Sequence, residues 1–265
     1  MHSTSSRSLF AGALCVALLS VTDAAANERR FTYTYESGTL PTGAVEFEPW
    51  TTARIGREAY YLRFDQRLEF EMGLTDALQT AFYINFTGVG QRAGGALTES
   101  FSFGGVSSDW KLKLLDPVAD ALGLALYAEI GVGPLETEFE FKVILDKRLG
   151  DFLLAFNAVA EIELEKEADK TVTEIVAETD LAFAYLLSQR ASLGLEIRTH
   201  SEFADGEYEH TALFVGPAFS YAMEKYWIAL SVMIQAAAFG GHADGSPDLH
   251  EHEQVNARVI LGFHL

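Results

Sequence analysis

The chain has 265 residues, of which 49% are hydrophobic and 12% aromatic, and this composition excludes a disordered or collagen-like protein. Its 38 acidic residues against 19 basic ones give a net charge of −19. This balance argues against a nucleic-acid partner, because phosphate contacts need clustered Lys and Arg. The single cysteine, Cys15, excludes a disulfide framework and a thiolate metal site.

The first 26 residues have the features of a secretory signal. Arg7 stands in a short polar region, an apolar run extends from Leu9 to Val21, and alanines fill positions 24–26. The apolar run is too short to cross a bilayer as a helix. We therefore expect cleavage after residue 26, which removes Cys15 and leaves an exported chain without thiols.

The remaining chain has the periodicity of strands. From Tyr60 to Met72, the even positions are almost wholly apolar and the odd positions are mostly charged. Such alternation predicts a strand with one apolar and one polar face. This segment is longer than the usual strand of about five or six residues, whereas a tilted strand of about ten residues crosses a bilayer.

The same alternation recurs along the chain. In chain order, the expected strands lie near 43–53, 60–72, 78–86, 106–114, 122–132, 135–145, 152–164, 175–185, 191–201, 210–222, 226–238 and 253–265. An even number of strands keeps both ends of a single-chain bacterial barrel on one side of the membrane. We predict an all-β protein, a 12-stranded antiparallel transmembrane β-barrel.

The expected connections differ in length between the two ends of the barrel. Short inner turns are expected at 73–77, 116–120, 146–151, 188–190 and 223–225, and the longest outer loops at 91–103 and 239–252. Short turns at one end and longer loops at the other are typical of outer-membrane barrels. The expected organisation is a cleaved signal at 1–26, a short periplasmic N-terminal segment at 27–42 and the barrel at 43–265.

The last strand carries a family resemblance. Its apolar positions alternate to the end of the sequence, at Ala257, Val259, Leu261, Phe263 and Leu265. This pattern resembles the signal by which bacterial outer-membrane barrel proteins are recognised for assembly, although those proteins usually end in Phe or Trp. The turn at 73–79 likewise resembles the periplasmic turns of porin-like proteins.

The resemblance to porin-like and transporter-like barrels extends over residues 43–265. It implies a location in the bacterial outer membrane and contact with outer-membrane lipid. It also implies recognition by the outer-membrane assembly machinery through residues 257–265.

The charged residues indicate what the barrel interior does. If the apolar faces meet lipid, the alternate positions face the lumen, because lipid cannot satisfy polar groups. We expect two groups of charged side chains on opposite walls at similar depth: the acids Glu138, Glu140, Glu161, Glu163, Glu174 and Glu178, and the arginines Arg63, Arg67 and Arg258.

A wall of carboxylates facing arginines resembles a porin constriction, and acidic rings favour cations. We interpret the chain as a narrow channel for small solutes that prefers cations. In the alternative interpretation, the same charges pair with one another and fill a narrow barrel. The protein would then be a non-conducting outer-membrane barrel with a structural or adhesion-type role.

A histidine-rich segment near the C-terminus gives a second hypothesis. His242, His250 and His252 lie among carboxylates, and imidazole nitrogens suit zinc, copper or nickel. Their spacing matches no established metal motif, and the glycines and the proline of this segment favour an irregular solvated loop. We expect the loop, with metal binding by these three histidines as the alternative.

An outer-membrane lipid hydrolase is the competing enzyme class. The pair His200-Ser201 superficially resembles the His and Ser residues of such enzymes. Neighbouring side chains on a strand point to opposite faces, so these two cannot easily meet. We expect no enzymatic activity and no cofactor.

Overall fold

The computed structural model describes residues 28–166, 170–204, 206–241 and 243–265. The expected signal at 1–26 lies outside these ranges. Within the described ranges, no helix is long and apolar enough to span a membrane. Strands account for most of the described residues.

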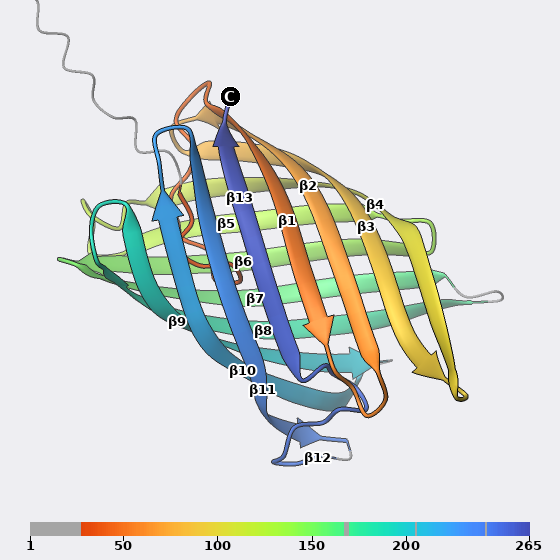
Figure 1. Cartoon of the computed structure of the whole chain (residues 1–265). Coiled ribbons are helices and arrows are strands. Elements are labelled where there is room, and N and C mark those ends of the chain that lie inside the picture. The colour runs from red at the N-terminus through yellow and green to blue at the C-terminus, as the bar shows by residue number, and fades with distance from the viewer. Residues whose placement is uncertain (1–27, 167–169, 205, 242) are drawn as a thin grey trace, which may run out of the picture.

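Twelve long antiparallel strands form a closed β-barrel (Figure 1). They are β1 (Val45–Ile55), β2 (Tyr61–Thr75), β3 (Leu78–Ala93), β4 (Ala96–Leu115), β5 (Gly123–Val132), β6 (Glu136–Leu149), β7 (Phe152–Lys166), β8 (Thr171–Leu186), β9 (Ala191–Ala204), β10 (Glu207–Ala222), β11 (Tyr226–Gly240) and β13 (Val255–His264). Strands β1 to β11 pair consecutively, and β13 pairs with both β1 and β11. The two-residue strand β12 (Ala243–Asp244) pairs with β11 in the connection that precedes β13. The predicted 12-stranded antiparallel barrel is confirmed.

The two faces of each strand follow the alternation of the sequence. On β3, Phe82 is 56% exposed on the outer face, whereas Ala81 and Tyr83 on either side of it are buried. Glu69 and Glu129 are buried on the inner face. Because successive side chains point to opposite sides of a sheet, the barrel is apolar outside and polar inside.

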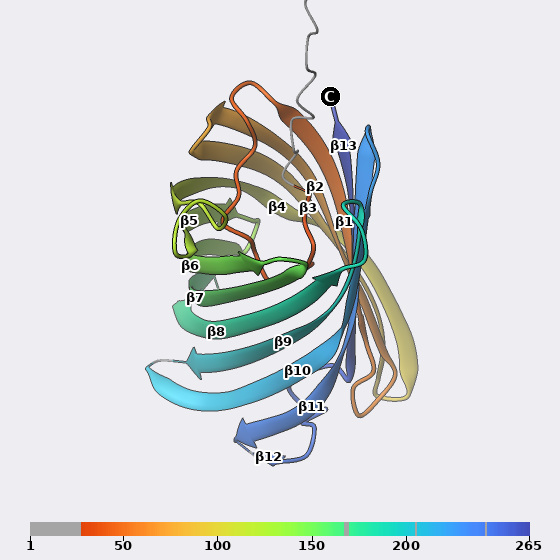
Figure 2. The same ribbon diagram turned by 90° about the vertical axis from the view of Figure 1, so that its left-hand side faces the viewer.

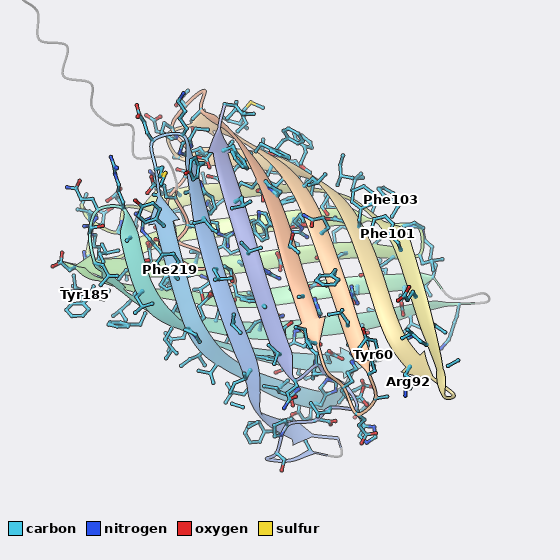
Figure 3. All side chains as sticks on the ribbon, in the orientation of Figure 1. Tyr60, Arg92, Phe101, Phe103, Tyr185 and Phe219 are labelled. Atoms are coloured by element: carbon cyan, nitrogen blue, oxygen red, sulfur yellow. The ribbon has the colours of Figure 1, made fainter. Side chains whose placement is uncertain are left out.

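Large apolar side chains cover the outside of the barrel. Figure 3 shows Phe101, Phe103, Tyr185 and Phe219 projecting from it, and all four are exposed. An exposed apolar surface of this extent is unusual on a soluble monomer, whereas the hydrocarbon core of a bilayer favours it. The outer surface therefore suits a lipid environment.

The connections define two ends of the barrel, named here the turn end and the loop end. The turn end carries the connections 76–77, 116–122, 150–151, 187–190 and 223–225, and the loop end carries 56–60, 94–95, 133–135, 167–170, 205–206 and 241–254. The C-terminus lies at the turn end, where Leu265 N–H bonds to the carbonyl of Val45. The longest connection, 241–254, lies at the loop end.

The expected long loop at 91–103 is wrong. Strands β3 and β4 continue through this region and are joined by Gly94 and Gly95 alone. Both glycines have positive φ, 58° and 85°, which a tight two-residue hairpin requires and which glycine adopts without strain. Most connections at the loop end are therefore as short as those at the turn end.

The N-terminal segment, residues 28–42, runs inside the barrel (Figure 2). Phe31 and Leu40 are fully buried, and Tyr33 and Tyr35 pack against residues of the barrel wall. Sequence analysis placed this segment in the periplasm, outside the barrel. The difference arises because its apolar and aromatic side chains find a buried surface in the lumen, where wall residues also satisfy its backbone.

Candidate functional site

A carboxylate on β9 holds the N-terminal segment in place. Glu196 is fully buried, and its two oxygens accept the backbone N–H groups of Thr32, Tyr33 and Thr34 at 3.0, 2.9 and 2.8 Å. Ser231 of β11 also donates a hydrogen bond to Glu196. These contacts satisfy three backbone donors that would otherwise be buried without a partner.

Side chains from other strands fix the rest of the segment. The Asn157 amide of β7 accepts from the Tyr35 nitrogen at 2.6 Å and donates to the Tyr35 carbonyl at 3.0 Å. Gln79 of β3 accepts the Leu40 N–H at 2.9 Å. The segment is thus anchored to strands on opposite walls of the barrel.

The chain leaves the lumen close to the turn between β2 and β3. Asp76 accepts hydrogen bonds from the Thr42 nitrogen at 3.0 Å and from its hydroxyl at 2.6 Å, and these bonds lower the pKa of Asp76. Gly73 permits the close approach, because a Cβ there would lie 2.1 Å from the Pro41 carbonyl oxygen. The turn and the segment therefore fit each other at backbone level.

Two cavities of unequal size border the segment inside the barrel. On the turn-end side, a cavity of about 10 Å³ lies between Arg29, Glu48, Glu71 and Lys111. That volume holds roughly one water molecule. Towards the loop end, a larger cavity of about 350 Å³ remains, and Tyr33 and Tyr35 of the segment form part of its lining.

The larger cavity, named here the vestibule, contains most of the charged residues that the sequence singled out. Its lining includes Glu138, Glu140, Glu161, Glu163 and Glu178 as well as Arg63, Arg67 and Arg258. Glu174 is absent from the described lining, but it pairs in register with Glu163. The geometry thus brings eight of the nine predicted lumen residues together around one space.

The acids form a dense cluster on β5, β6 and β7. Glu140 stands opposite Glu129 on one side and opposite Glu161 on the other. Glu138 stands opposite Glu163. Like charges in directly opposite positions repel, so the strands alone give this arrangement no stability.

The acidic residues differ in their partners. Glu140 pairs with Lys142 at 3.0 Å, and Glu178 pairs with Arg198. In the part of the chain that the structure describes, Glu138, Glu161 and Glu163 form no salt bridge. These three carboxylates are the uncompensated part of the cluster.

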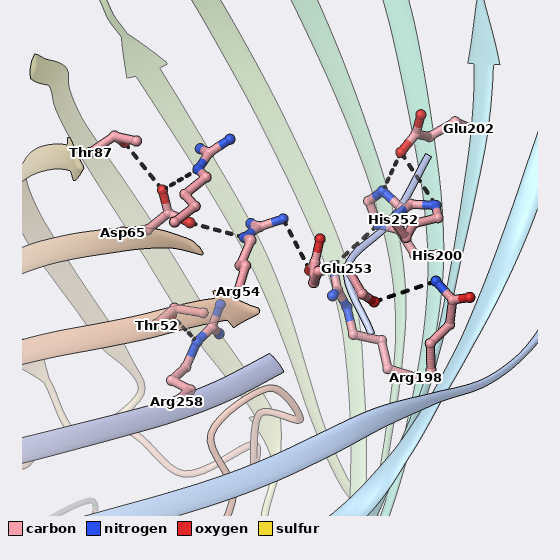
Figure 4. A network of polar contacts seen from close by, with 12 residues as sticks. Thr52, Arg54, Asp65, Thr87, Arg198, His200, Glu202, His252, Glu253 and Arg258 are labelled. Atoms are coloured by element: carbon pink, nitrogen blue, oxygen red, sulfur yellow. Dashed lines mark hydrogen bonds and ion pairs between the residues drawn. The ribbon is translucent and has the colours of Figure 1, made fainter. Parts of the chain in front are cut away.

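Arginines occupy the facing strands. Arg63 bonds Asp65 at 2.7 Å, and Arg67 reaches Glu129 at 3.1 Å. Arg258 donates to the Thr52 hydroxyl at 2.8 Å (Figure 4). It also lies 3.9 Å from the centre of the Tyr33 ring, in contact with the segment.

Arg54 and the two tyrosines of the N-terminal segment, Tyr33 and Tyr35, line this site but were not predicted from the sequence. Arg54 lines the vestibule and contacts Asp65 at 2.9 Å, although the expected first strand ended at residue 53. Its even position on β1, in step with Glu46 and Glu48, was the signal that could have found it. Tyr33 was missed because the N-terminal segment was expected outside the barrel.

The charges of the vestibule nearly balance. Eight acidic and six basic side chains line it, so the excess of acid is smaller than the alternation alone suggested. Acidic residues are concentrated further towards the turn end, where Glu46, Glu48, Glu69 and Glu71 are buried. The vestibule is therefore defined by the separation of charge between its walls more than by its net charge.

The histidine-rich segment is only partly as expected. His250 is exposed and pairs with Glu58 at 3.0 Å. His252 is buried and turned towards β9 and β10. His242 lies outside the described residues. His250 and His252 thus have different partners in the described part of the chain.

The pair His200-Ser201 does not assemble a hydrolase site. His200 bonds Glu178 and Glu202 at 2.5 and 2.8 Å on the inner face. Ser201 instead accepts a hydrogen bond from Thr211 at 2.8 Å. The two side chains have separate partners, as expected for neighbours on a strand.

Solved structures share this architecture. An outer membrane channel from Pseudomonas putida F1 gives a TM-score of 0.65 at 13% identity, over 86% of this chain and 98% of that chain. The NanC porin gives a TM-score of 0.56 at 10% identity, over 83% of this chain and 100% of the porin chain. The β domain of the Bordetella autotransporter BrkA gives a TM-score of 0.53 at 10% identity, over 84% of this chain and 100% of that domain. At these identities the likeness is one of fold, and it confirms the family-level resemblance to bacterial outer-membrane barrels.

Comparison by sequence gives a match to a family model. No curated protein matches the chain. A family model described as a family of unknown function (DUF6662) matches residues 23–265, and the chain belongs to that family.

Proposed function

We propose that this protein is a bacterial outer-membrane channel for small solutes, with a preference for cations, and that residues 28–42 close it in the conformation described here. The observation that carries the cation preference is the group of Glu138, Glu161 and Glu163, which line the vestibule without a salt bridge in the described chain. The fold, the apolar outer face and the likeness to outer-membrane channels support the location.

The electrostatic argument rests on confinement. Carboxylates on low-dielectric walls focus the field into the space they enclose and raise the local concentration of cations. The arginines opposite them create a field across the vestibule, which orients dipolar or charged solutes. A small cation entering from the loop end therefore meets the acids of β6 and β7 before it reaches the segment.

Passage requires that the segment move. With residues 28–42 in place, the turn-end cavity of about 10 Å³ has room for roughly one water molecule and for no larger solute. The anchors at Glu196 and Asn157 are hydrogen bonds, which can be exchanged for bonds to water when the segment leaves. The proposal therefore includes an open state in which these bonds are broken.

The second candidate is a non-conducting barrel. The observation that favours it is the fit of the segment, which buries Phe31 and Leu40 completely and satisfies its backbone from several strands. In that case residues 28–42 are a permanent part of the core, and the vestibule is a cavity that does not continue through the barrel.

Selectivity in planar bilayers separates the two candidates. The substitutions Glu196→Gln and Asn157→Ala are introduced together in order to release the segment. The reversal potential is then measured under a salt gradient. In this released chain, changing Glu138, Glu161 and Glu163 to Gln should move the reversal potential towards zero. Changing Glu99 and Glu207 to Gln serves as the matched control, because both side chains are exposed outside the vestibule.

Each outcome decides one part of the proposal. Cation preference that falls with the vestibule variants and persists in the control supports the acidic vestibule as the selectivity element. Equal selectivity in all three chains removes these acids from the mechanism. Absence of current in every chain, with a folded barrel, establishes the non-conducting candidate.

A further inference from the structure

A cluster of three histidines and one glutamate lies at the loop end, beside the vestibule. His200 and Glu202 come from β9, His210 from β10, and His252 from the connection 241–254. His210 stands opposite Glu202, next to an irregularity in the pairing of β9 and β10. Such irregularities re-aim side chains, and here they accompany a convergence of residues distant in sequence (Figure 4).

The ligand atoms of the cluster face one another. The Nε2 atoms of His210 and His252 lie 2.7 Å apart. Glu202 approaches His200 Nε2 at 2.8 Å, His210 Nε2 at 3.4 Å and His252 Nε2 at 3.8 Å. Three imidazole nitrogens thus point at one carboxylate.

Four donor–donor separations, three of them measured to one or the other Glu202 oxygen, lie near the edges of a metal coordination sphere. Zinc binds His nitrogen at about 2.0–2.1 Å and carboxylate oxygen at about 2.0–2.2 Å, so the donors of a tetrahedral site lie roughly 3.3 Å from each other. The four distances fall on either side of that value. Side-chain shifts of a few tenths of an ångström would equalise them.

A second carboxylate orients one of the imidazoles. Glu178 lies 2.5 Å from His200 Nδ1, and Arg198 lies 3.2 Å from the same nitrogen. With Nδ1–H donated to Glu178, the lone pair of Nε2 is directed at the cluster. A carboxylate behind a ligating imidazole is the usual outer support of a metal-binding histidine.

The connection 241–254 is held so that His252 stays in place. The His252 N–H bonds the Asp248 carbonyl at 3.2 Å, and Gln235 of β11 donates to the same carbonyl at 3.1 Å. His252 also packs edge-on against Phe214. The His252 side chain is therefore ordered by contacts that do not depend on the other histidines.

We propose that His200, Glu202, His210 and His252 bind one divalent transition-metal ion. Three imidazoles and one carboxylate suit zinc, copper or nickel, whereas calcium and magnesium prefer oxygen ligands throughout. Binding would join the longest connection of the barrel to β9 and β10 at the entrance of the vestibule. This site differs from the set His242, His250 and His252, which the sequence offered as an alternative to a solvated loop, and shares only His252 with it.

Calorimetric titration with zinc chloride tests the proposal. The folded mature chain is prepared in detergent without a polyhistidine tag, because such a tag binds the same ions. We expect one zinc ion per chain for the native protein. Replacing His252 by Ala should weaken binding at least about tenfold, and the pair His200→Ala with His210→Ala should abolish it. Calcium chloride should give no comparable binding.

The control is His250→Ala. This histidine is exposed, belongs to the same connection and pairs with Glu58, so its loss should leave zinc affinity unchanged. Visible absorption of bound cobalt provides a second readout, and circular dichroism verifies that each variant is folded. The proposal is overturned if the folded native chain binds no zinc, or if His252→Ala binds it as tightly as the native chain.

Discussion

The Glu196 carboxylate accepts a hydrogen bond from the backbone nitrogen of Tyr33 at 2.9 Å, across 163 positions of sequence. This contact places a buried acid of β9 beneath the N-terminal segment rather than on an open channel wall. A carboxylate that accepts several backbone N–H groups is well solvated by the protein itself. The lumen acids therefore have two roles, since Glu196 anchors the segment while Glu138 and Glu163 line the vestibule.

Replacing Glu196 by Gln should loosen the segment. The amide keeps the shape of the side chain but loses the charge and one acceptor, and hydrogen bonds to charged groups contribute about 1.5–3 kcal/mol each. We expect the free energy of unfolding to fall by roughly that amount, together with faster amide exchange at residues 32–34. Exposed Glu207→Gln is the control. Unchanged exchange at these amides would show that Glu196 does not hold the segment.

The lipid-facing assignment of the outer face can be tested, because the free-energy cost of placing an arginine there depends on its depth in the bilayer. Leu126 lies outside on β5, opposite the central Val143 of β6, and Leu114 lies outside near the turn end of β4. Leu126→Arg should cost about 2–4 kcal/mol in bilayers, whereas Leu114→Arg should cost about 0–1 kcal/mol. Unfolding by denaturant in lipid vesicles measures both. Equal costs would show that Leu126 does not lie nearer the bilayer midplane than Leu114.

The turn at Asp76 provides a pH-dependent contact. Hydrogen bonds from Thr42 lower the pKa of Asp76 below its ordinary value. A carboxyl whose pKa is lowered on folding contributes stability above its unfolded pKa and loses it as the pH falls through the folded one. We expect the protection of the Thr42 amide, corrected for the intrinsic pH dependence of amide exchange, to fall on acidification, and Asp76→Asn should remove that fall. A flat pH profile in the native chain would contradict this assignment.

The strand faces were predictable because a period of two leaves each side chain only two directions. Glu69 and Glu129 follow from the alternation of their own strands, without knowledge of any contact. The vestibule follows partly for the same reason, since neighbouring strands bring residues of similar depth together. Arg54 was missed because the expected first strand ended at residue 53, two residues before the end of β1.

Other features could not be read from local pattern. The position of Tyr33 inside the barrel depends on a hydrogen bond to Glu196, and the sequence around either residue gives no sign of this contact. The proposed metal site brings His210 and His252 together, and their spacing along the chain resembles no motif. Residues 91–103 were expected to form a loop, whereas β3 and β4 stay paired through Phe101 up to the hairpin at Gly94-Gly95.

The central claim is that residues 28–42 close the lumen and that their release opens it. Single-channel conductance in planar bilayers tests this most directly, with the native mature chain compared with the chain carrying Glu196→Gln and Asn157→Ala. We expect the native chain to be closed nearly all the time, and the variant, with its barrel intact by circular dichroism, to conduct. A native chain that conducts as readily as the variant would contradict the claim.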